Sequence, residues 1–356
     1  MAPNLQTTGP LRVFVTGATG YIGSTAIDLL LHKGTTPSLY SLRALVRSPK
    51  KASLILPLGI EPILGSLDDL ALLEQESAQA DVVLSFADAD HLPSIQAILR
   101  GLSQRPRPDG GRKRPILIHT SGTGVLLDNA YGAYGTETIY YDNDLAKLNS
   151  LAPSQPHRNV DLEIISPALV GLVDTYIVAP PTIWGQGTGP GNHTSIQIPL
   201  QVRASLLHSQ AMQLGQGLNV WSKIHVIDLA HLYLSLLERA LQEPQDDSIT
   251  GTLPKNQDAY YFCQEGEDFS YGDVAKEIAK AFKDLGINDS GTVRGTKPEE
   301  ESALWLEGAA GSIGGNSRSR AIKAREILGW VPEFKDFAGY IHDEIKRQLK
   351  EQGRRR

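Results

Sequence analysis

Three glycines near the amino terminus have the spacing of a phosphate-binding turn. They stand at positions 17, 20 and 23 of the segment Thr16-Gly17-Ala18-Thr19-Gly20-Tyr21-Ile22-Gly23. An apolar stretch at 12–15 precedes the turn, and an amphipathic stretch at 24–33 that ends at Gly34 follows it. Glycine permits a tight turn and a close approach to a pyrophosphate, and the N–H groups that begin a helix favour negative charge. Strand, turn and helix in this order predict a dinucleotide-binding site; a purely structural glycine turn is the alternative.

The residue that ends the second predicted strand indicates which dinucleotide binds. That strand covers 39–47 and ends in Arg47, and no Asp or Glu occurs from Leu39 to Leu58. An acidic residue at this position binds the 2′-hydroxyl of NAD, whereas an arginine accommodates the 2′-phosphate of NADP. We therefore expect NADP(H) to be preferred over NAD(H). The alternative is that Arg47 is only a solvated strand end.

Apolar strands alternate with helical segments through the first half of the chain. Further strands are predicted at 60–65, 81–86, 115–120 and 175–179, and helices at 50–56, 67–79, 91–103 and 157–169. Such alternation predicts an α/β fold with a Rossmann-type doubly wound parallel sheet, whose ligands bind at the carboxyl ends of the strands. We expect residues 1–179 to form the NADP-binding Rossmann domain. Residues 180–356 are expected to form a smaller, mainly substrate-binding α/β part, with 220–241 returning to the Rossmann domain.

Composition excludes several classes of function. The 356 residues include 34 Lys and Arg against 40 Asp and Glu, a net charge of −6, so no basic field attracts nucleic acid. The only cysteine, Cys263, excludes an internal disulfide, and no metal-ligand spacing occurs. No apolar run approaches the ~20 residues of a membrane span. We expect a cytoplasmic protein with a small-molecule substrate and without a metal, nucleic-acid or membrane partner; a homodimer is left open.

Five segments carry motifs of one known family. Residues 16–23 match TGATGYIG, and 65–68 are similar to GD-hydrophobe-x-D with Ser66 in place of the acid. Residues 179–185 are similar to RPxxVYG with Ala179 in place of the arginine, 221–230 to FIHVDDVA, and 317–332 to the region that ends in LGWxP. Together they resemble the extended short-chain dehydrogenase/reductase superfamily, in its NAD(P)-dependent epimerase/dehydratase branch.

The strand ends and the resemblance imply two sets of binding residues. The expected cofactor-binding residues are Gly17, Thr19, Gly20, Tyr21, Ile22, Gly23, Arg47, Ser66, Leu67, Phe86, Ala87, Thr120, Ser121 and Pro180. The expected substrate-binding residues are Asp88, Tyr141, Trp184, His193 and Trp221.

The catalytic motif of the family does not occur in this chain. The resemblance implies a tyrosine four residues before a lysine, but Asn143 stands four residues before Lys147. Residues 156–163 align best with the family's catalytic helix, which places His157 at the tyrosine position and Asp161 at the lysine position. The family's SSxxVYG resembles residues 120–126, with Ser121 and Thr123 on either side of the usual hydroxyl position.

Two interpretations follow. In the first, His157 is the acid/base, Asp161 orients it four residues further along the helix, and Ser121 or Thr123 orients the reacting oxygen. The chain would then act on a hydroxyl or carbonyl of a small metabolite, by hydride transfer or a related isomerisation. In the second, His157 is structural. The chain would then be a non-redox isomerase or lyase on the same scaffold, or an NmrA-like NADP sensor that binds a protein partner.

Overall fold

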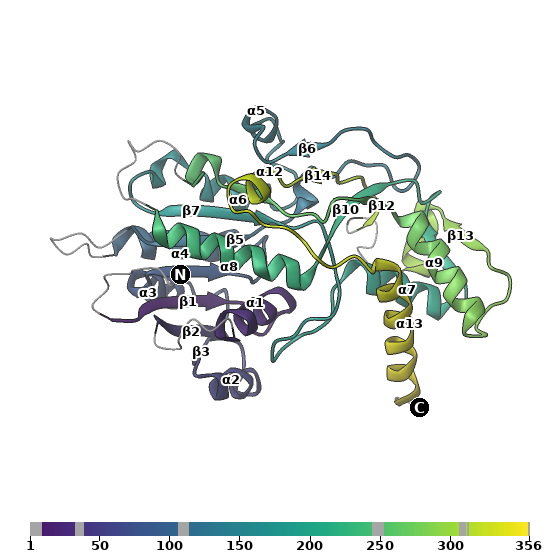
Figure 1. The fold of residues 1–356 in the computed structure, drawn as a ribbon, viewed down its shortest axis with the longest axis horizontal. Helices are drawn as coiled ribbons and strands as arrows, with labels where there is room; N and C mark the ends of the chain where they lie inside the picture. Colours follow the sequence, from purple (N-terminus) through teal and green to yellow (C-terminus); the bar gives the residue numbers. More distant parts are fainter. Residues whose placement is uncertain are drawn as a thin grey trace.

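A seven-stranded parallel sheet forms the centre of the molecule (Figure 1). The computed structural model describes residues 9–32, 39–105, 114–243, 253–305, 311 and 313–354; the predicted helix end at Gly34 and most of the predicted loop at 104–114 lie outside them. The strand order is β11-β7-β5-β4-β1-β2-β3, which confirms the predicted Rossmann-type fold. The strands are β1 (Leu11–Thr16), β2 (Tyr40–Val46), β3 (Glu61–Leu64), β4 (Val82–Ser85), β5 (Ile116–Thr120), β7 (Asp174–Ala179) and β11 (Tyr260–Phe262).

Helices pack on this sheet and bury its central strands. Every residue of β4 and β5 is buried, as expected of continuous apolar strands between two helical layers. Helix α1 (Tyr21–His32) packs against α8 (Val226–Gln242), and α4 (Leu92–Gln104) packs against α3 (Leu70–Gln79) and α6 (Arg158–Ile164). Helix α2 (Pro49–Ile55) connects β2 to β3.

Two helix boundaries differ from the prediction for local chemical reasons. Helix α3 begins at Leu70 instead of residue 67, because Asp69 precedes it and its carboxylate accepts the N–H of Ser66 at 2.6 Å. The predicted helix at 157–169 ends at Ile164 and is followed by a 3-10 turn, Pro167–Leu169. A proline disfavours the helical conformation of the residue before it, so the segment breaks at Ser166.

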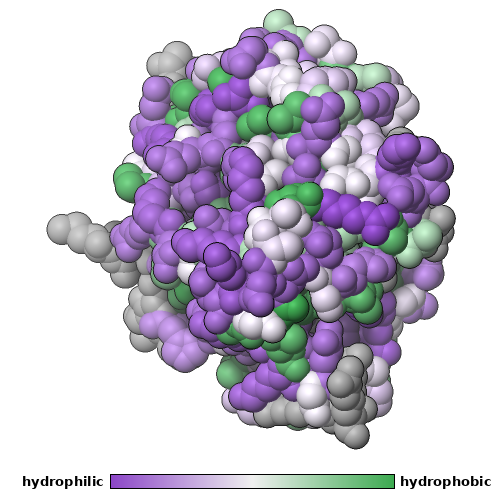
Figure 2. All heavy atoms as spheres, turned by 90° about the vertical axis from the view of Figure 1, so that its right-hand side faces the viewer, coloured by the Kyte–Doolittle hydropathy of each residue, from purple (hydrophilic) through white to green (hydrophobic). Residues whose placement is uncertain are grey.

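A smaller lobe lies beyond the carboxyl ends of the central strands, on the right of Figure 1. It has its own hydrophobic cluster, which includes Trp221, Phe282 and Ile341, and the face that it presents in Figure 2 is mainly hydrophilic. Its elements are β8 (Thr182–Trp184), α7 (Gln197–Leu207), β9 (Ala211–Leu214), β10 (Val220–His225), β12 (Asp268–Ser270), α9 (Tyr271–Asp284), β13 (Val293–Thr296), α10 (Glu301–Leu304) and α13 (Phe337–Arg354). The chain thus leaves the large sheet after β7 and returns to it at β11.

Short elements connect the two parts. Strand β6 (Tyr140–Tyr141) pairs with β14 (Ser319–Arg320), and between them Asp142 accepts the N–H groups of Phe262, Ile322 and Lys323. Burial raises the pKa of Asp142 to about 6. Helices α5 (Leu145–Asn149) and α12 (Ile322–Glu326) flank this connection. No helix in the described part of the chain has the length and apolar character needed to cross a membrane.

Candidate active site

The glycine turn between β1 and α1 is closed by its own backbone. The N–H of Gly20 donates to the carbonyl of Gly17 at 2.8 Å, and Gly17 has a φ of +78°. A Cβ at Gly17 would lie 2.7 Å from the backbone nitrogen of Ala87, and one at Gly23 would lie 2.4 Å from the carbonyl oxygen of Gly17. Only glycine fits at both positions, so the start of α1 packs directly against the end of β4.

Arg47 follows the last residue of β2 and has an exposed side chain. It makes no ion pair with any described residue, whereas Arg43 on the same strand is paired with Glu76 at 2.8 Å and Glu61 at 2.6 Å. A strand-end guanidinium without a carboxylate partner is chemically suited to a phosphate. Ser66 and Leu67 lie at the neighbouring end of β3.

The loop after β8 packs over the glycine turn. The N–H of Asn192 donates to the carbonyl of Thr19 at 3.0 Å, and the hydroxyl of Tyr21 donates to the carbonyl of Gly185 at 2.7 Å. A Cβ at Gly191 would lie 2.2 Å from the carbonyl oxygen of Thr19, so this loop also depends on glycine. The smaller lobe is therefore tied directly to the predicted cofactor site.

A cleft of about 560 Å³ opens where the strand ends meet the smaller lobe. It brings together the predicted residues Tyr21, Ile22, Phe86, Ser121, His157, Pro180 and Trp221. The other lining residues in the described part of the chain are Asp90, Gly122, Gly124, Leu127, Pro156, Pro181, Ile183, Asn192, Thr194, Ser195, Ile196, Gln197 and Gly311. Ligands of α/β sheets bind at this edge, so the cleft is the candidate active site.

His157 is held at the edge of this cleft by Asp90. One carboxylate oxygen of Asp90 accepts from the backbone N–H of His157 at 3.0 Å and lies 2.9 Å from its Nδ1. His157 precedes α6 with a φ of 66°, a conformation that non-glycine residues adopt at a cost. Its Nε2 faces Gly122 and Gly124, where an added Cβ would lie 3.1 Å and 2.9 Å away. The ring is thus fixed at one nitrogen and faces the cleft wall with the other.

Asp161 does not orient His157, which corrects the prediction made from their spacing. Its Oδ2 accepts instead from the hydroxyls of Ser121 at 2.9 Å and Tyr260 at 2.7 Å, and Arg158 donates to Tyr260 at 2.8 Å. Asp161 is fully buried, and this burial raises its pKa to about 6 against the opposing effect of the two hydroxyl donors. The physical reason is the helical turn: the ring of His157 points back toward Asp90, while Asp161 lies on the buried face of α6.

Several predicted site residues lie away from the cleft. Thr123 is completely buried and does not line it. Trp184 is buried in the smaller lobe, where its indole N–H donates to Glu265 at 2.8 Å. Tyr141 pairs with the β14 strand, and Asp88 accepts the N–H of Asp90. His193 is exposed and, like these three, is not among the described lining residues; Trp221 is the only one of the five predicted substrate residues that is.

Asp90 and Tyr260 were not among the site residues assigned from the sequence. Asp90 lies five residues beyond the last residue of β4, at the end of the segment 86–90 where the strand-end rule expects ligands, but the sequence suggested no role for it. Tyr260 lies in β11 and gave no such signal, because strand pairing across the sheet brings its hydroxyl to Asp161.

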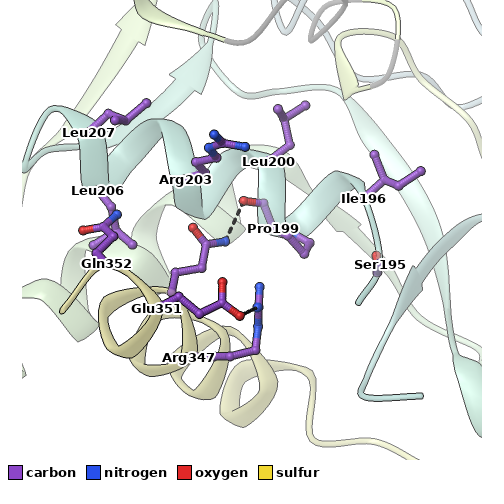
Figure 3. Close-up of a pocket in the computed structure, with 11 residues that line it drawn as sticks. Ser195, Ile196, Pro199, Leu200, Arg203, Leu206, Leu207, Arg347, Glu351 and Gln352 are labelled. Atoms are coloured by element: carbon purple, nitrogen blue, oxygen red, sulfur yellow. Dashed lines mark hydrogen bonds and ion pairs between the residues drawn. The ribbon is translucent and has the colours of Figure 1, made fainter. Parts of the chain in front are cut away.

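A second groove of about 800 Å³ lies between α7 and α13 (Figure 3). Arg347 and Glu351 form an ion pair at 2.6 Å there, and Arg203 projects into the same groove from α7. Neither His157 nor the glycine turn lines it, and it meets the cleft only at Ser195 and Ile196. It is therefore not the catalytic site.

Comparisons with known proteins agree with this fold and site. The model of the NAD dependent epimerase/dehydratase family matches residues 13–96, which include the glycine turn and Arg47. An oxidase of Acremonium sp., ucsJ, is 30% identical over 341 residues, which cover 90% of this chain and 92% of the relative. The chain belongs to the NAD-dependent epimerase/dehydratase family, as the resemblance implied.

Two further comparisons concern part of the chain and its fold. A 4-hydroxy-2-methyl-3-oxo-4-farnesyl-3,4-dihydroquinoline-1-oxide ketoreductase of Stigmatella aurantiaca is 39% identical over 123 residues, 33% of this chain and 35% of the relative. The dTDP-glucose 4,6-dehydratase of Bacillus anthracis, solved in complex with NAD, superposes with a TM-score of 0.65 at 16% identity. That match covers 96% of this chain and 97% of the dehydratase and shows a shared fold. The predicted class, an NAD(P)-dependent oxidoreductase or isomerase, is confirmed at the level of the family.

Proposed function

We propose that this chain is an NADP(H)-dependent oxidoreductase that interconverts a hydroxyl and a carbonyl of a small metabolite, with His157 as the proton carrier. The observation that carries the proposal is the His157–Asp90 pair at the cleft edge. A carboxylate at Nδ1 fixes the orientation of the ring, so that Nε2 is left to exchange a proton with a substrate oxygen.

The residues of the glycine turn and of the strand ends fit a bound dinucleotide. Gly17 and Gly23 leave no room for a side chain, and the N–H groups at the start of α1 would hold the pyrophosphate. Arg47 would hold the 2′-phosphate, because its guanidinium is exposed and has no described carboxylate partner. When bound, the nicotinamide ring would supply the hydride acceptor or donor of the reaction.

Ser121 and Asp161 would position the substrate oxygen beside His157. The Ser121 hydroxyl donates its hydrogen to Asp161, so toward the substrate it acts as an acceptor. A substrate hydroxyl could donate its single hydrogen to Ser121 as it binds, and would turn that hydrogen to Nε2 of His157, to which the proton passes during oxidation. In the reverse direction the protonated ring would return the proton to the forming hydroxyl.

Two relatives favour redox chemistry over the non-redox alternative. The relative that is named an oxidase matches 90% of this chain, and the relative that is named a ketoreductase matches 33% of it. Both names are those of redox enzymes, and transfer of a hydride together with a carried proton is a redox reaction.

Substitution of His157 by glutamine tests the proton carrier. Glutamine cannot carry a proton, so we expect turnover of a ketone panel by NADPH to fall by about 100- to 10,000-fold. The NADPH Kd, measured by nicotinamide fluorescence, should change less than twofold, since His157 lies beyond the glycine turn. Unchanged turnover in His157→Gln would remove the assigned role, and product formation without any change in NADPH absorbance would favour the non-redox isomerase or lyase.

Substitution of Arg47 by alanine tests the preference for NADP. Loss of a charge-assisted bond should weaken NADP+ binding about 10- to 100-fold and leave NAD+ binding unchanged. Arg294→Ala, which removes the same charge from an exposed site in β13, is the matched control. Equal losses for both dinucleotides, or a wild-type chain that prefers NAD+, would contradict the assignment.

A further inference from the structure

We infer that the substrate of this cleft is an uncharged, largely apolar molecule that carries a hydroxyl or a ketone, and not a sugar linked to a nucleoside diphosphate. The inference rests on the proposed function, because it names the substrate class of the same site. No lysine or arginine occurs among the described residues that line the cleft. Its charged or chargeable lining groups are Asp90 and His157, which are bonded to each other.

Four basic side chains on the elements around the cleft are bonded to other groups, and Arg203 of α7 projects into the second groove instead of the cleft. Lys223 of β10 is buried against Glu265 at 3.0 Å, and Arg158 is buried against the hydroxyl of Tyr260. Arg318 and Arg320 both hold Asp268, at 2.8 Å and 2.9 Å. A diphosphate requires donors that are not already bonded, and breaking a buried pair would leave an uncompensated charge.

The helix start beside the cleft is also a poor anion site. Helix α7 begins at Gln197, and the free N–H groups of a first turn ordinarily attract phosphate. Here Pro199 lacks an N–H group, so one donor of that first turn is missing. The preceding Ile196 is 74% exposed and places a hydrocarbon side chain at the mouth of the cleft.

The cleft wall offers carbon surface instead. The indole N–H of Trp221 donates to the carbonyl of Gly315 at 2.7 Å, so the indole presents carbon to the cleft. Ile183, Leu127 and Pro181 continue this apolar wall. The side-chain amide of Asn192 is bonded at both ends to the backbone of Thr194. An apolar pocket with a few polar groups at one edge binds uncharged molecules and orients them by those groups.

Binding of two probes to the full chain tests this substrate class. The first probe is 2-naphthol, an uncharged bicyclic phenol, and the second is dTDP-glucose; both are titrated by calorimetry with and without NADPH. We expect 2-naphthol to bind with a Kd of about 0.1 mM and dTDP-glucose to bind at least 30-fold more weakly. Binding of dTDP-glucose as tight as or tighter than that of 2-naphthol, or no binding of 2-naphthol, would overturn the inference.

A pair of variants locates the binding. Ile196→Arg places a cation at the cleft mouth and should weaken 2-naphthol about tenfold. The control is Leu207→Arg. Leu207 is the last residue of α7, is 62% exposed and does not line the cleft, so this variant should leave the Kd of 2-naphthol unchanged. Equal effects of the two variants would place 2-naphthol elsewhere and overturn the inference. Because the NADPH Kd is measured in the same samples, failure of the cofactor assignment is distinguished from failure of the substrate class.

Discussion

The two halves of the candidate site, the glycine turn and the group around His157, are built from different parts of the chain. The proposed dinucleotide half is made of backbone: Gly17 and Gly23 shape the turn, and the proposed donors are N–H groups at the start of α1. The proposed catalytic half is made of side chains: Asp90 follows β4, Ser121 follows β5 and His157 precedes α6. A backbone site tolerates few substitutions within one short segment, whereas a side-chain site can exchange its groups one at a time. This difference would account for a chain that carries the family's glycine turn without the tyrosine and lysine spacing that the resemblance implies.

The largest effect is expected from a substitution in the glycine turn. In Gly17→Ala the added Cβ would lie 2.7 Å from the backbone at Phe86 and Ala87, in a turn with positive φ. We expect the NADPH Kd to rise more than about 100-fold, because the turn must open to relieve that contact. Calorimetric titration with NADPH measures the affinity, and thermal unfolding measures the loss of stability.

Gly59 supplies a matched control for this substitution. Gly59 has a φ of +76°, close to the +78° of Gly17, so a side chain would strain the backbone similarly at both positions. At Gly59, however, nothing lies within 4 Å of an added Cβ. Gly59→Ala should therefore lose about 1–2 kcal/mol of stability from backbone strain and bind NADPH as the wild type does. Equal affinities in the two variants would mean that Gly17 does not shape a dinucleotide site.

The fold and the dinucleotide turn could be predicted because their signals are local. The apolar strands and the turn glycines each depend on neighbours within a few residues. The division at residue 179 stays a prediction, although β11 shows that a strand from the second half completes the large sheet. Strand pairing of this kind has no local signal.

The catalytic half could be predicted only in part. The alignment placed His157 at the cleft, where the structure also has it. The i, i+4 spacing suggested Asp161 as its partner, but spacing along a helix does not say which side chain faces the core. Asp161 faces inward to Ser121 and Tyr260, and the true partner, Asp90, comes from another loop. Trp184 was expected there from the resemblance and Tyr141 as one of the clustered tyrosines of the loop at 129–156, and the structure packs both side chains away from the cleft.

Substitutions of Asp90 are expected to have a smaller effect, and they test its support of His157. Asn at position 90 keeps an oxygen that can accept from both N–H groups of His157 but removes the charge, so we expect kcat to fall about tenfold. Asp90→Ala removes the acceptor as well, and kcat should fall about 100-fold because the ring loses its fixed orientation. The NADPH KM should stay unchanged in both variants, which separates a catalytic role from a structural one.

Nitrogen NMR of His157 provides a readout independent of turnover. In the wild type the ring should carry its proton at Nδ1, facing Asp90, whereas Asp90→Ala should show a mixture of both tautomers. If Asp90→Ala and Asp90→Asn had the same kcat as the wild type, the Asp90–His157 pair would be structural. The role of proton carrier would then belong to another group.

The smallest expected effect concerns how two buried groups, Asp161 and His119, make the stability of the fold depend on pH. Burial raises the pKa of Asp161 to about 6 from an ordinary 3.8, so its ionisation destabilises the folded state increasingly as the pH rises from about 4 to 6. Burial also lowers the pKa of His119 to about 3 from 6.5, so its protonation destabilises the fold as the pH falls through the same range. The two slopes have opposite signs and partly cancel.

Asp161→Asn should remove the pH dependence of stability that comes from Asp161 and leave the one that comes from His119. Between pH 6 and pH 4 the variant should then lose about 2 kcal/mol more of its free energy of unfolding than the wild type does, measured by urea denaturation at each pH. Asp343→Asn, at an exposed position of α13, should follow the wild-type curve. Parallel curves for Asp161→Asn and the wild type would mean that this carboxyl is not held apart from water. Ser121 would then be free to donate to the substrate, since the bond that makes it an acceptor depends on the same buried carboxylate.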